Sequence, residues 1–196
     1  MAITTVAQAR AEVLQRVRDP NNVQHADVIL DVLTDAQRLV AVAMASTSTD
    51  ATLTLTPRQV LYTYSAIASD VARILHVTYQ GRALQRANWR EFSHAHPVWL
   101  HAVGDVPRHW DVIGHNLLAV FPSPPTATRS VTVRYVPILG TLGASDALTI
   151  PSAHVPLMLD IAEEVLLLRA RLFPSIEGAV AAEDRHIDAK TMRPPL

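Results

Sequence analysis

The first part of the chain carries apolar residues every three or four positions, the spacing of an amphipathic helix. Residues 4–18 form the first such segment, and Thr5 with Gln8 three residues later has the spacing of a capping box. Residues 19–22 (DPNN) interrupt the pattern, because proline cannot continue a helix. A second helical pattern runs from about Val23 to Ala45, and its alanine-rich apolar seam predicts an antiparallel hairpin of two closely packed helices.

After a polar loop at residues 46–50 the pattern changes to the alternation typical of strands, first in residues 52–56 (TLTLT). Residues 60–64 fit either a strand or a helix capped by residues 56–59, and the β-rich sequence that follows favours the strand. A short helix is expected at residues 88–95. The other predicted strands are 71–80 and 83–86, joined by a turn at Gly81-Arg82, and then 109–113, 117–121 and 130–136.

A long apolar helix follows, from about Pro156 to Leu172, with the proline tolerated only in its first turn. Its apolar residues surround most of the helix, so we expect its own domain or neighbouring subunits to cover it. The preceding loop, residues 138–150, contains two glycines and is expected to project from the body. A last helix is predicted from Ile176 to about Met192. This order of helices, strands and helices predicts an α+β fold, and 196 residues suit a single domain.

Composition excludes several classes of function. Lys and Arg number 17 against 18 Asp and Glu, so the chain lacks the excess of base expected for sequence-independent nucleic-acid binding. It contains no cysteine, which excludes a disulfide framework and thiol catalysis. No apolar run is long enough to span a bilayer and the N-terminus has no secretion signal, so we expect no membrane partner.

Histidine is the one residue type that suggests a metal site. Five histidines lie close together in the sequence: His94, His96, His101, His109 and His115. His94 and His96 form a His-x-His motif, and their two side chains would share a face on an extended chain. Their spacing matches no known ligand signature, which favours loop histidines over a metal centre. Motifs of nucleophilic, phosphate-binding or zinc-dependent enzymes are absent as well. We therefore predict no catalytic residue, no metal, no cofactor and no enzymatic activity.

Two charged patterns at helical spacing remain. Asp27, Asp31 and Asp35 would form an acidic stripe, which is either a solvated face or a site for a basic surface of a partner, such as the region of Arg16 on a neighbouring subunit. The other pattern is formed by Arg82, Arg86 and Arg90, which align on a helix but scatter in the predicted hairpin. A solvated or intersubunit role is favoured for them over contact with nucleic acid.

The order of these segments resembles the head-to-tail connector, or adaptor, proteins of tailed bacteriophages. The N-terminal helical pair carries the resemblance together with a series of short motifs: residues 52–56 (TLTLT), 70–75 (DVARIL) leading to 81–84 (GRAL), 110–114 (WDVIG), 117–124 (LLAVFPSP), 131–135 (VTVRY), and Ile150-Pro151 before the long helix. It spans most of the chain.

The resemblance implies a helical bundle from the N- and C-terminal helices, residues 1–48 and 152–192, with an inserted antiparallel β-sheet region at 51–150. It further implies a structural virion protein, made in the host cytoplasm, that forms a ring, usually a dodecamer, below the portal. DNA passes through such a ring without specific binding, and a tail or stopper protein is the second partner. A tail-completion protein elsewhere on the tail is the nearer alternative, and a small metal-binding protein using the histidine cluster is the other.

Within this interpretation the C-terminal segment contacts the portal and the β part faces the tail. The expected portal-binding residues are Lys190, Met192, Arg193 and Leu196. The expected subunit-interface residues are Asp27, Asp31, Asp35, Arg16, Leu159 and Leu166.

Overall fold

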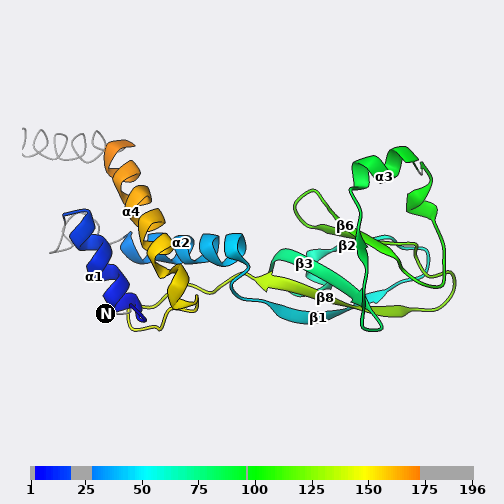
Figure 1. The fold of residues 1–196 in the computed structure, drawn as a ribbon, viewed down its shortest axis with the longest axis horizontal. Helices are drawn as coiled ribbons and strands as arrows, with labels where there is room; N and C mark the ends of the chain where they lie inside the picture. The colour runs from blue at the N-terminus through cyan, green and yellow to red at the C-terminus, as the bar shows by residue number, and fades with distance from the viewer. Residues whose placement is uncertain (1–2, 19–27, 96, 173–196) are drawn as a thin grey trace, which may run out of the picture. The chain divides into compact units, whose positions relative to one another are not determined.

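A computed structural model describes residues 3–18, 28–95 and 97–172 (Figure 1). The chain divides into two compact units, which we call the helical unit (residues 1–37 with 141–196) and the β unit (residues 38–140). Three predicted features lie outside the described residues: the interruption of the helix at 19–22, the last helix at 176–192 and the C-terminal tail. No helix within the described ranges is long and apolar enough to cross a membrane.

The helical unit is built around α1 (Val6–Arg16) and α4 (Val155–Leu172), which lie side by side (Figure 1). The predicted capping box is present, because the Thr5 hydroxyl accepts a hydrogen bond from the Gln8 amide and the Gln8 side chain accepts one from the Thr5 amide, both at 3.3 Å. At the other end of α1, Arg16 donates to Asp160 of α4 at 2.8 Å. The short turn η3 (Ser152–His154) leads into α4, whose first turn contains Pro156 as predicted.

A third helix, α2 (Ile29–Met44), begins in the helical unit, and its last residues belong to the β unit. Its predicted apolar seam is largely buried, but the return segment at residues 141–149 borders it. Two buried polar side chains make this contact: Thr34 accepts a hydrogen bond from the Leu142 amide and Gln37 accepts one from the Thr149 amide, both at 3.1 Å. The return segment also binds α1, since the Val6 amide donates to the Asp146 carbonyl at 2.9 Å.

Three expectations about the helices are therefore wrong. The fold is not a bundle of terminal helices: the described residues form four α-helices and eight strands in two sheets, and the helices are short, with 11 residues in α1 and seven in α3 (Trp89–Ala95). α1 packs along α4 instead of forming a hairpin with α2. The loop at 138–150 does not project, because the amides of Leu142 and Thr149 donate to α2 and the amide of Leu148 donates to the Thr4 carbonyl. Periodicity identified the buried faces but not what covers them.

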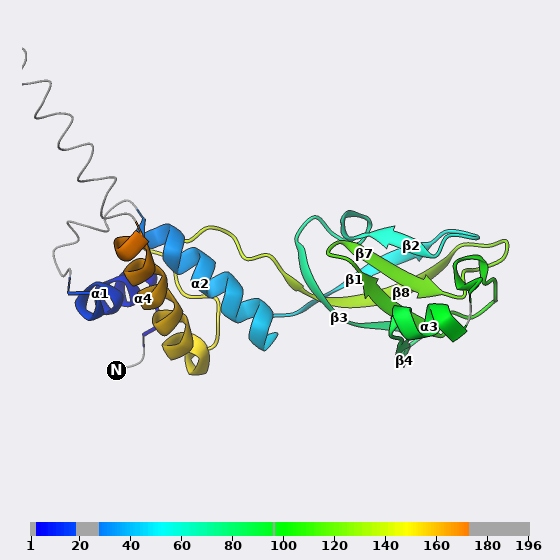
Figure 2. The ribbon, with the colours of Figure 1, turned by 90° about the horizontal axis from the view of Figure 1, so that it is seen from above.

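The β unit contains two four-stranded sheets. The first has the order β1-β8-β3-β4, and its strands are β1 (Thr49–Leu55), β8 (Arg129–Pro137), β3 (Val71–Tyr79) and β4 (Arg82–Ala83). The second has the order β2-β7-β6-β5, and its strands are β2 (Leu61–Thr63), β7 (Leu117–Phe121), β6 (His109–Ile113) and β5 (Gln85–Arg86). Figure 1 shows β2 and β6 of the second sheet above β1, β3 and β8 of the first, and Figure 2 shows the strands of the two sheets overlapping when seen from above. All strand pairs are antiparallel except β5–β6, which is parallel.

The inner faces of the two sheets share one hydrophobic core. Leu53 of β1, Val77 of β3 and Val133 of β8 meet Trp110 of β6 and Leu118 of β7. Along β8 the alternation is regular, with Val131, Val133 and Tyr135 buried and Thr132 and Arg134 exposed. Each sheet buries one face against the other, so the β unit has a core of its own.

Most of the strand predictions are confirmed. β6 and β7 have the predicted bounds, and β1 and β8 begin or end within a few residues of theirs. The ambiguous residues 60–64 do form a strand, β2, followed by the turn η1 (Tyr64–Ala66). The hairpin at Gly81-Arg82 is present but short, because β5 leaves β4 to pair with β6 in the other sheet.

We expect Thr5→Ala to lower the free energy of unfolding by about 1 kcal/mol, because it removes the acceptor that caps α1. Thr5→Ser, which keeps the hydroxyl, is the matched control and should lose only a small part of this. Chemical denaturation followed by circular dichroism measures both. Equal losses in the two variants would show that the methyl group matters and not the cap.

We also expect Gln37→Met to destabilise the return segment by about 1 kcal/mol, the net value of one lost hydrogen bond to Thr149. Hydrogen exchange at the Thr149 amide should become faster while the amides of β3 and β8 keep their protection. Gln15→Met, at an exposed position on α1, is the control. Unchanged exchange at Thr149 would contradict the role given to Gln37.

Candidate interaction surfaces

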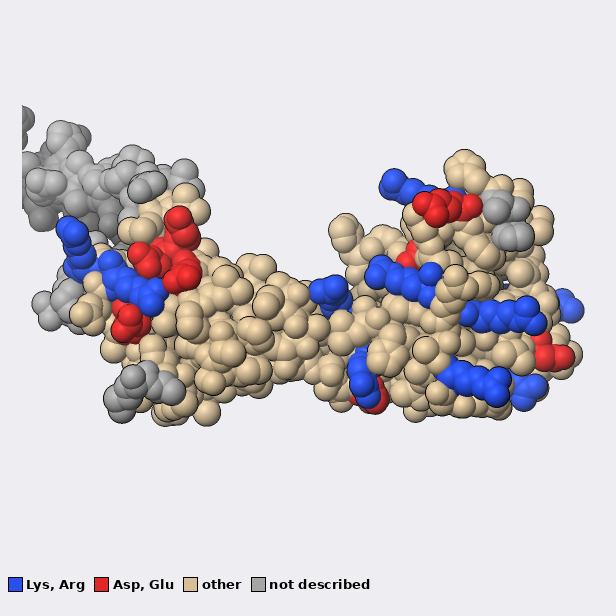
Figure 3. Space-filling view, in the orientation of Figure 1, with Lys and Arg blue, Asp and Glu red and all other residues tan. Residues whose placement is uncertain are grey.

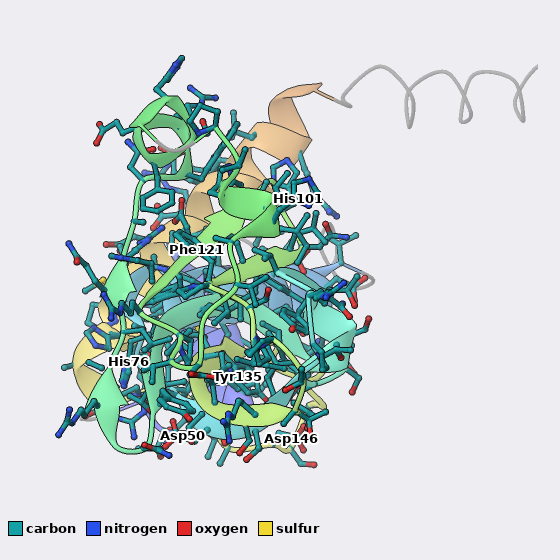
Figure 4. The ribbon with its side chains drawn as sticks, turned by 90° about the vertical axis from the view of Figure 1, so that its right-hand side faces the viewer. Asp50, His76, His101, Phe121, Tyr135 and Asp146 are labelled. Atoms are coloured by element: carbon teal, nitrogen blue, oxygen red, sulfur yellow. The ribbon has the colours of Figure 1, made fainter. Side chains whose placement is uncertain are left out.

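The members of the histidine cluster that the structure describes do not come together at one site. His94, His101 and His115 are exposed, while His96 lies outside the described residues. His109 points inward, with its ring centroid 5.5 Å from those of Phe92 and Phe121. Figure 4 shows His101 and His76 on different sides of the β unit. In the described part of the chain no three histidine or acidic side chains are placed to share a metal ion.

The acidic stripe of α2 is exposed where it is described. Asp31 and Asp35 both face solvent, and Asp27 lies outside the described residues. One turn further along, Leu39 continues the same line with 58% of its surface exposed. The exposed face of α2 thus combines two carboxylates with an apolar side chain.

Arg16 is engaged inside its own chain. Its guanidinium lies 3.0 Å from Glu12, 2.8 Å from Asp160 and 3.6 Å from Glu163. The hydrogen bond to Glu12, followed by the one to Asp160, raises the pKa of Arg16 above its usual value. This network joins the last turn of α1 to the middle of α4.

The two leucines expected at a subunit interface lie in the interior of the protomer. Leu159 is 2% exposed and Leu166 is fully buried. The leucines that α4 does present to solvent are Leu157 and Leu168, at 41% and 48% exposure. The expected portal-binding residues Lys190, Met192, Arg193 and Leu196 lie outside the described residues.

Charge is distributed unequally between the two units, and whole-chain composition hid this. The β unit has nine arginines, no lysine and five acids, a net charge of +4. The rest of the chain has eight bases and thirteen acids, a net charge of −5, which leaves −1 overall. Figure 3 shows basic side chains spread over the visible face of the β unit with few acids between them.

Several of these arginines have partners within the unit. Arg134 binds both carboxylate oxygens of Asp50, at 2.7 and 2.9 Å, and this hydrogen bonding lowers the pKa of Asp50. Arg86 lies 3.4 Å from the buried carboxylate of Asp111 and 5.4 Å from the centre of the Trp110 ring. The Asp111 carboxylate also accepts from the Trp89 amide at 2.9 Å, which fixes the start of α3.

Arg82, Arg86 and Arg90 do not align. They lie on β4, on β5 and in α3, so the scattered arrangement expected from the hairpin is the one observed.

A groove of about 520 Å³ lies beside the β3–β4 turn and contains two arginines without such partners. Arg82 comes from β4 and Arg108 from the residue before β6, and neither forms an ion pair with any described residue. Leu84 and Val106 give the groove an apolar wall. Sequence reasoning missed this site because its two charges are far apart in the chain.

The segment that joins α3 to β6 exposes an unusual amount of apolar surface. Four of its side chains are exposed by 42% to 70%: Val98, Leu100, Val103 and Val106. The segment is anchored by Trp99 in η2 (Trp99–His101), which is 6% exposed and packs on Phe121 at 5.1 Å between ring centroids. Four exposed apolar side chains within nine residues of a well-anchored segment suit a protein–protein contact.

A search of curated proteins found no match to the chain. Among protein families, the model of the SU10 adaptor protein matches residues 4–189, which is nearly the whole chain. The match confirms the resemblance seen in the sequence to phage head-to-tail adaptors. A family of structural proteins also agrees with the exposed apolar side chains of residues 98–106, which suit a protein–protein contact. The chain therefore belongs to the SU10 adaptor protein family and is a structural adaptor protein of a phage virion.

Proposed function

We propose that this adaptor forms a ring below the portal, through which DNA passes on its way to the tail. The observation that carries the proposal is the exposed apolar segment 98–106, because a connector must offer contact surfaces beyond those that fold it. The core of the β unit is closed between its two sheets and does not need these side chains. In this proposal Val98, Leu100 and Val103 face the tail or stopper protein.

The C-terminal tail is proposed as the portal contact. Residues 188–196 (DAKTMRPPL) combine two apolar side chains, Met192 and Leu196, with two cations, Lys190 and Arg193. The two prolines prevent continuation of a helix, so the tail suits binding in an extended form. A weak contact of this kind becomes strong when it is repeated around a ring.

The sides of the ring are proposed to use the exposed faces of the helical unit. The acidic stripe of Asp27, Asp31 and Asp35 supplies charge, and Leu157 and Leu168 supply apolar surface. Arg16, Leu159 and Leu166 act beneath this surface by holding α1 and α4 together. The net charge of −1 keeps the affinity of the ring for passing DNA low.

We expect deletion of residues 188–196 to abolish portal binding and to leave the melting temperature nearly unchanged. The segment is polar and proline-rich, so it has little surface to bury in its own fold. Co-sedimentation with purified portal and thermal melts of full-length and truncated protein measure the two effects. Replacing residues 188–196 by a glycine-serine segment of equal length is the control for chain length and should also fail to bind.

Normal portal binding by the truncated protein would remove the tail from the proposal. If the full-length protein binds isolated tails and not portals, it is a tail-completion protein located elsewhere on the tail.

We expect the double variant Val98→Asp/Val103→Asp to fold normally and to block the joining of tails to filled heads. Both side chains are about half or more exposed, so the carboxylates cost little in the free protein but oppose burial in a contact. In-vitro complementation of adaptor-deficient heads, scored as infectious particles, measures joining. Thr126→Asp/Ala127→Asp, at exposed positions of the same unit, is the control. Full infectivity of the Val98/Val103 variant would exclude this segment as the tail contact.

A further inference from the structure

We propose that the groove between Arg82 and Arg108 binds the exposed face of helix α2 from a second copy of this chain. The proposal rests on the ring proposed above and assigns its subunit contact. The α2 face consists of Asp31, Asp35 and Leu39, which we call the α2 stripe. The groove in the β unit of one copy thus receives helix α2 of the next.

The groove has the properties of a receptor for a carboxylate-bearing segment. Arg82 and Arg108 are both exposed and form no ion pair with any residue that the structure describes. Arg134 and Arg86 in the same unit, by contrast, each bind a carboxylate. Guanidinium groups match carboxylates in geometry and are favoured at protein interfaces. The apolar wall of the groove contains Leu84 and Val106, and Val106 is 50% exposed.

The α2 stripe is complementary to this groove in order and in chemistry. Asp31 and Asp35 are four residues apart, so their side chains lie on the same side of the helix, about 6 Å apart. Leu39 follows one turn later with 58% exposure. Two carboxylates can therefore meet the two guanidinium groups while Leu39 covers Val106. Asp31, Asp35 and Leu39 are all exposed on this face of α2.

A second copy is a better occupant than DNA for two reasons. The copies carry opposite charges on the two units, −5 against +4, so a contact between unlike units is electrostatically favoured. Two of the other arginines of the β unit, Arg86 and Arg134, already bind Asp111 and Asp50, so their charge is not available to a phosphate backbone. A contact between two different surfaces of the same chain is heterologous, and such contacts generate rings when the rotation between subunits closes.

Charge exchange between the two surfaces tests the proposal on the full chain without portal. The variant Asp31→Arg/Asp35→Arg has two basic surfaces, and the variant Arg82→Glu/Arg108→Glu has two acidic ones. Each alone should raise the concentration needed for self-association roughly tenfold or more. An equimolar mixture should restore association, because each variant now complements the other. Sedimentation velocity over a concentration series measures all three samples.

Arg58→Glu/Arg129→Glu is the matched control, since it makes the same change in charge at exposed arginines that do not line the groove. It should associate like the unchanged chain. Association equally weakened by the control would mean that net charge acts and not the groove, which overturns the proposal. Binding of duplex DNA that Arg82→Glu/Arg108→Glu abolishes, without any self-association of the unchanged chain, would overturn it as well.

A cysteine pair gives a second measurement that keeps all charges. The chain has no cysteine, so Leu39→Cys and Val106→Cys can be mixed and oxidised without background. A disulfide-linked dimer should form several times faster than with Leu39→Cys mixed with Ala127→Cys, an exposed position of the same unit. Equal rates would overturn the proposal. Portal binding is measured separately, so a failure of this contact and a failure of the connector function are distinguishable.

Discussion

The path of the chain depends on how α2 holds the segment that returns from the β unit. The backbone amides of Leu142 and Thr149 are bound by Thr34 and Gln37, two buried polar side chains one turn apart. Without these acceptors the amides would have to be hydrated, and the return segment would leave α2. Because the entry and exit of the β unit are fixed beside each other, the β unit can be an insertion that leaves α1 and α4 in contact.

The same contact explains where prediction from the sequence succeeded and failed. Local signals were reliable: the capping box at Thr5 and the alternation of β6, β7 and β8 predicted elements that are present. The helical bundle failed because periodicity shows that Ile29, Leu33 and Val40 are buried but not against what. The periodicity gives no role to Thr34 and Gln37, although they are the residues that bind the return segment.

The candidate surfaces were predictable only in part. The exposed Asp31 and Asp35 follow from helical spacing. The Arg82–Arg108 groove does not, because the order of strands in the sheets brings its two sides together. A net charge of −1 suggested an electrostatically neutral protein, whereas the domain division separates nine arginines from most of the acids. Family membership was visible because it depends on the order of many short elements, which survives an error about how helices pack.

Surface ion pairs contribute between about 0 and 1 kcal/mol each, so two of them with one apolar contact do not hold a pair of free subunits together at low concentration. Such pairs are also screened by salt over about 8 to 10 Å. On a template the balance changes, because a subunit already bound through its tail meets its neighbour at a high effective concentration. A closed ring built from the proposed contact contains one such contact per subunit, and no single contact has to be strong. Weak, charge-matched sides therefore suit a ring that closes at its binding site, while free subunits associate only at high concentration.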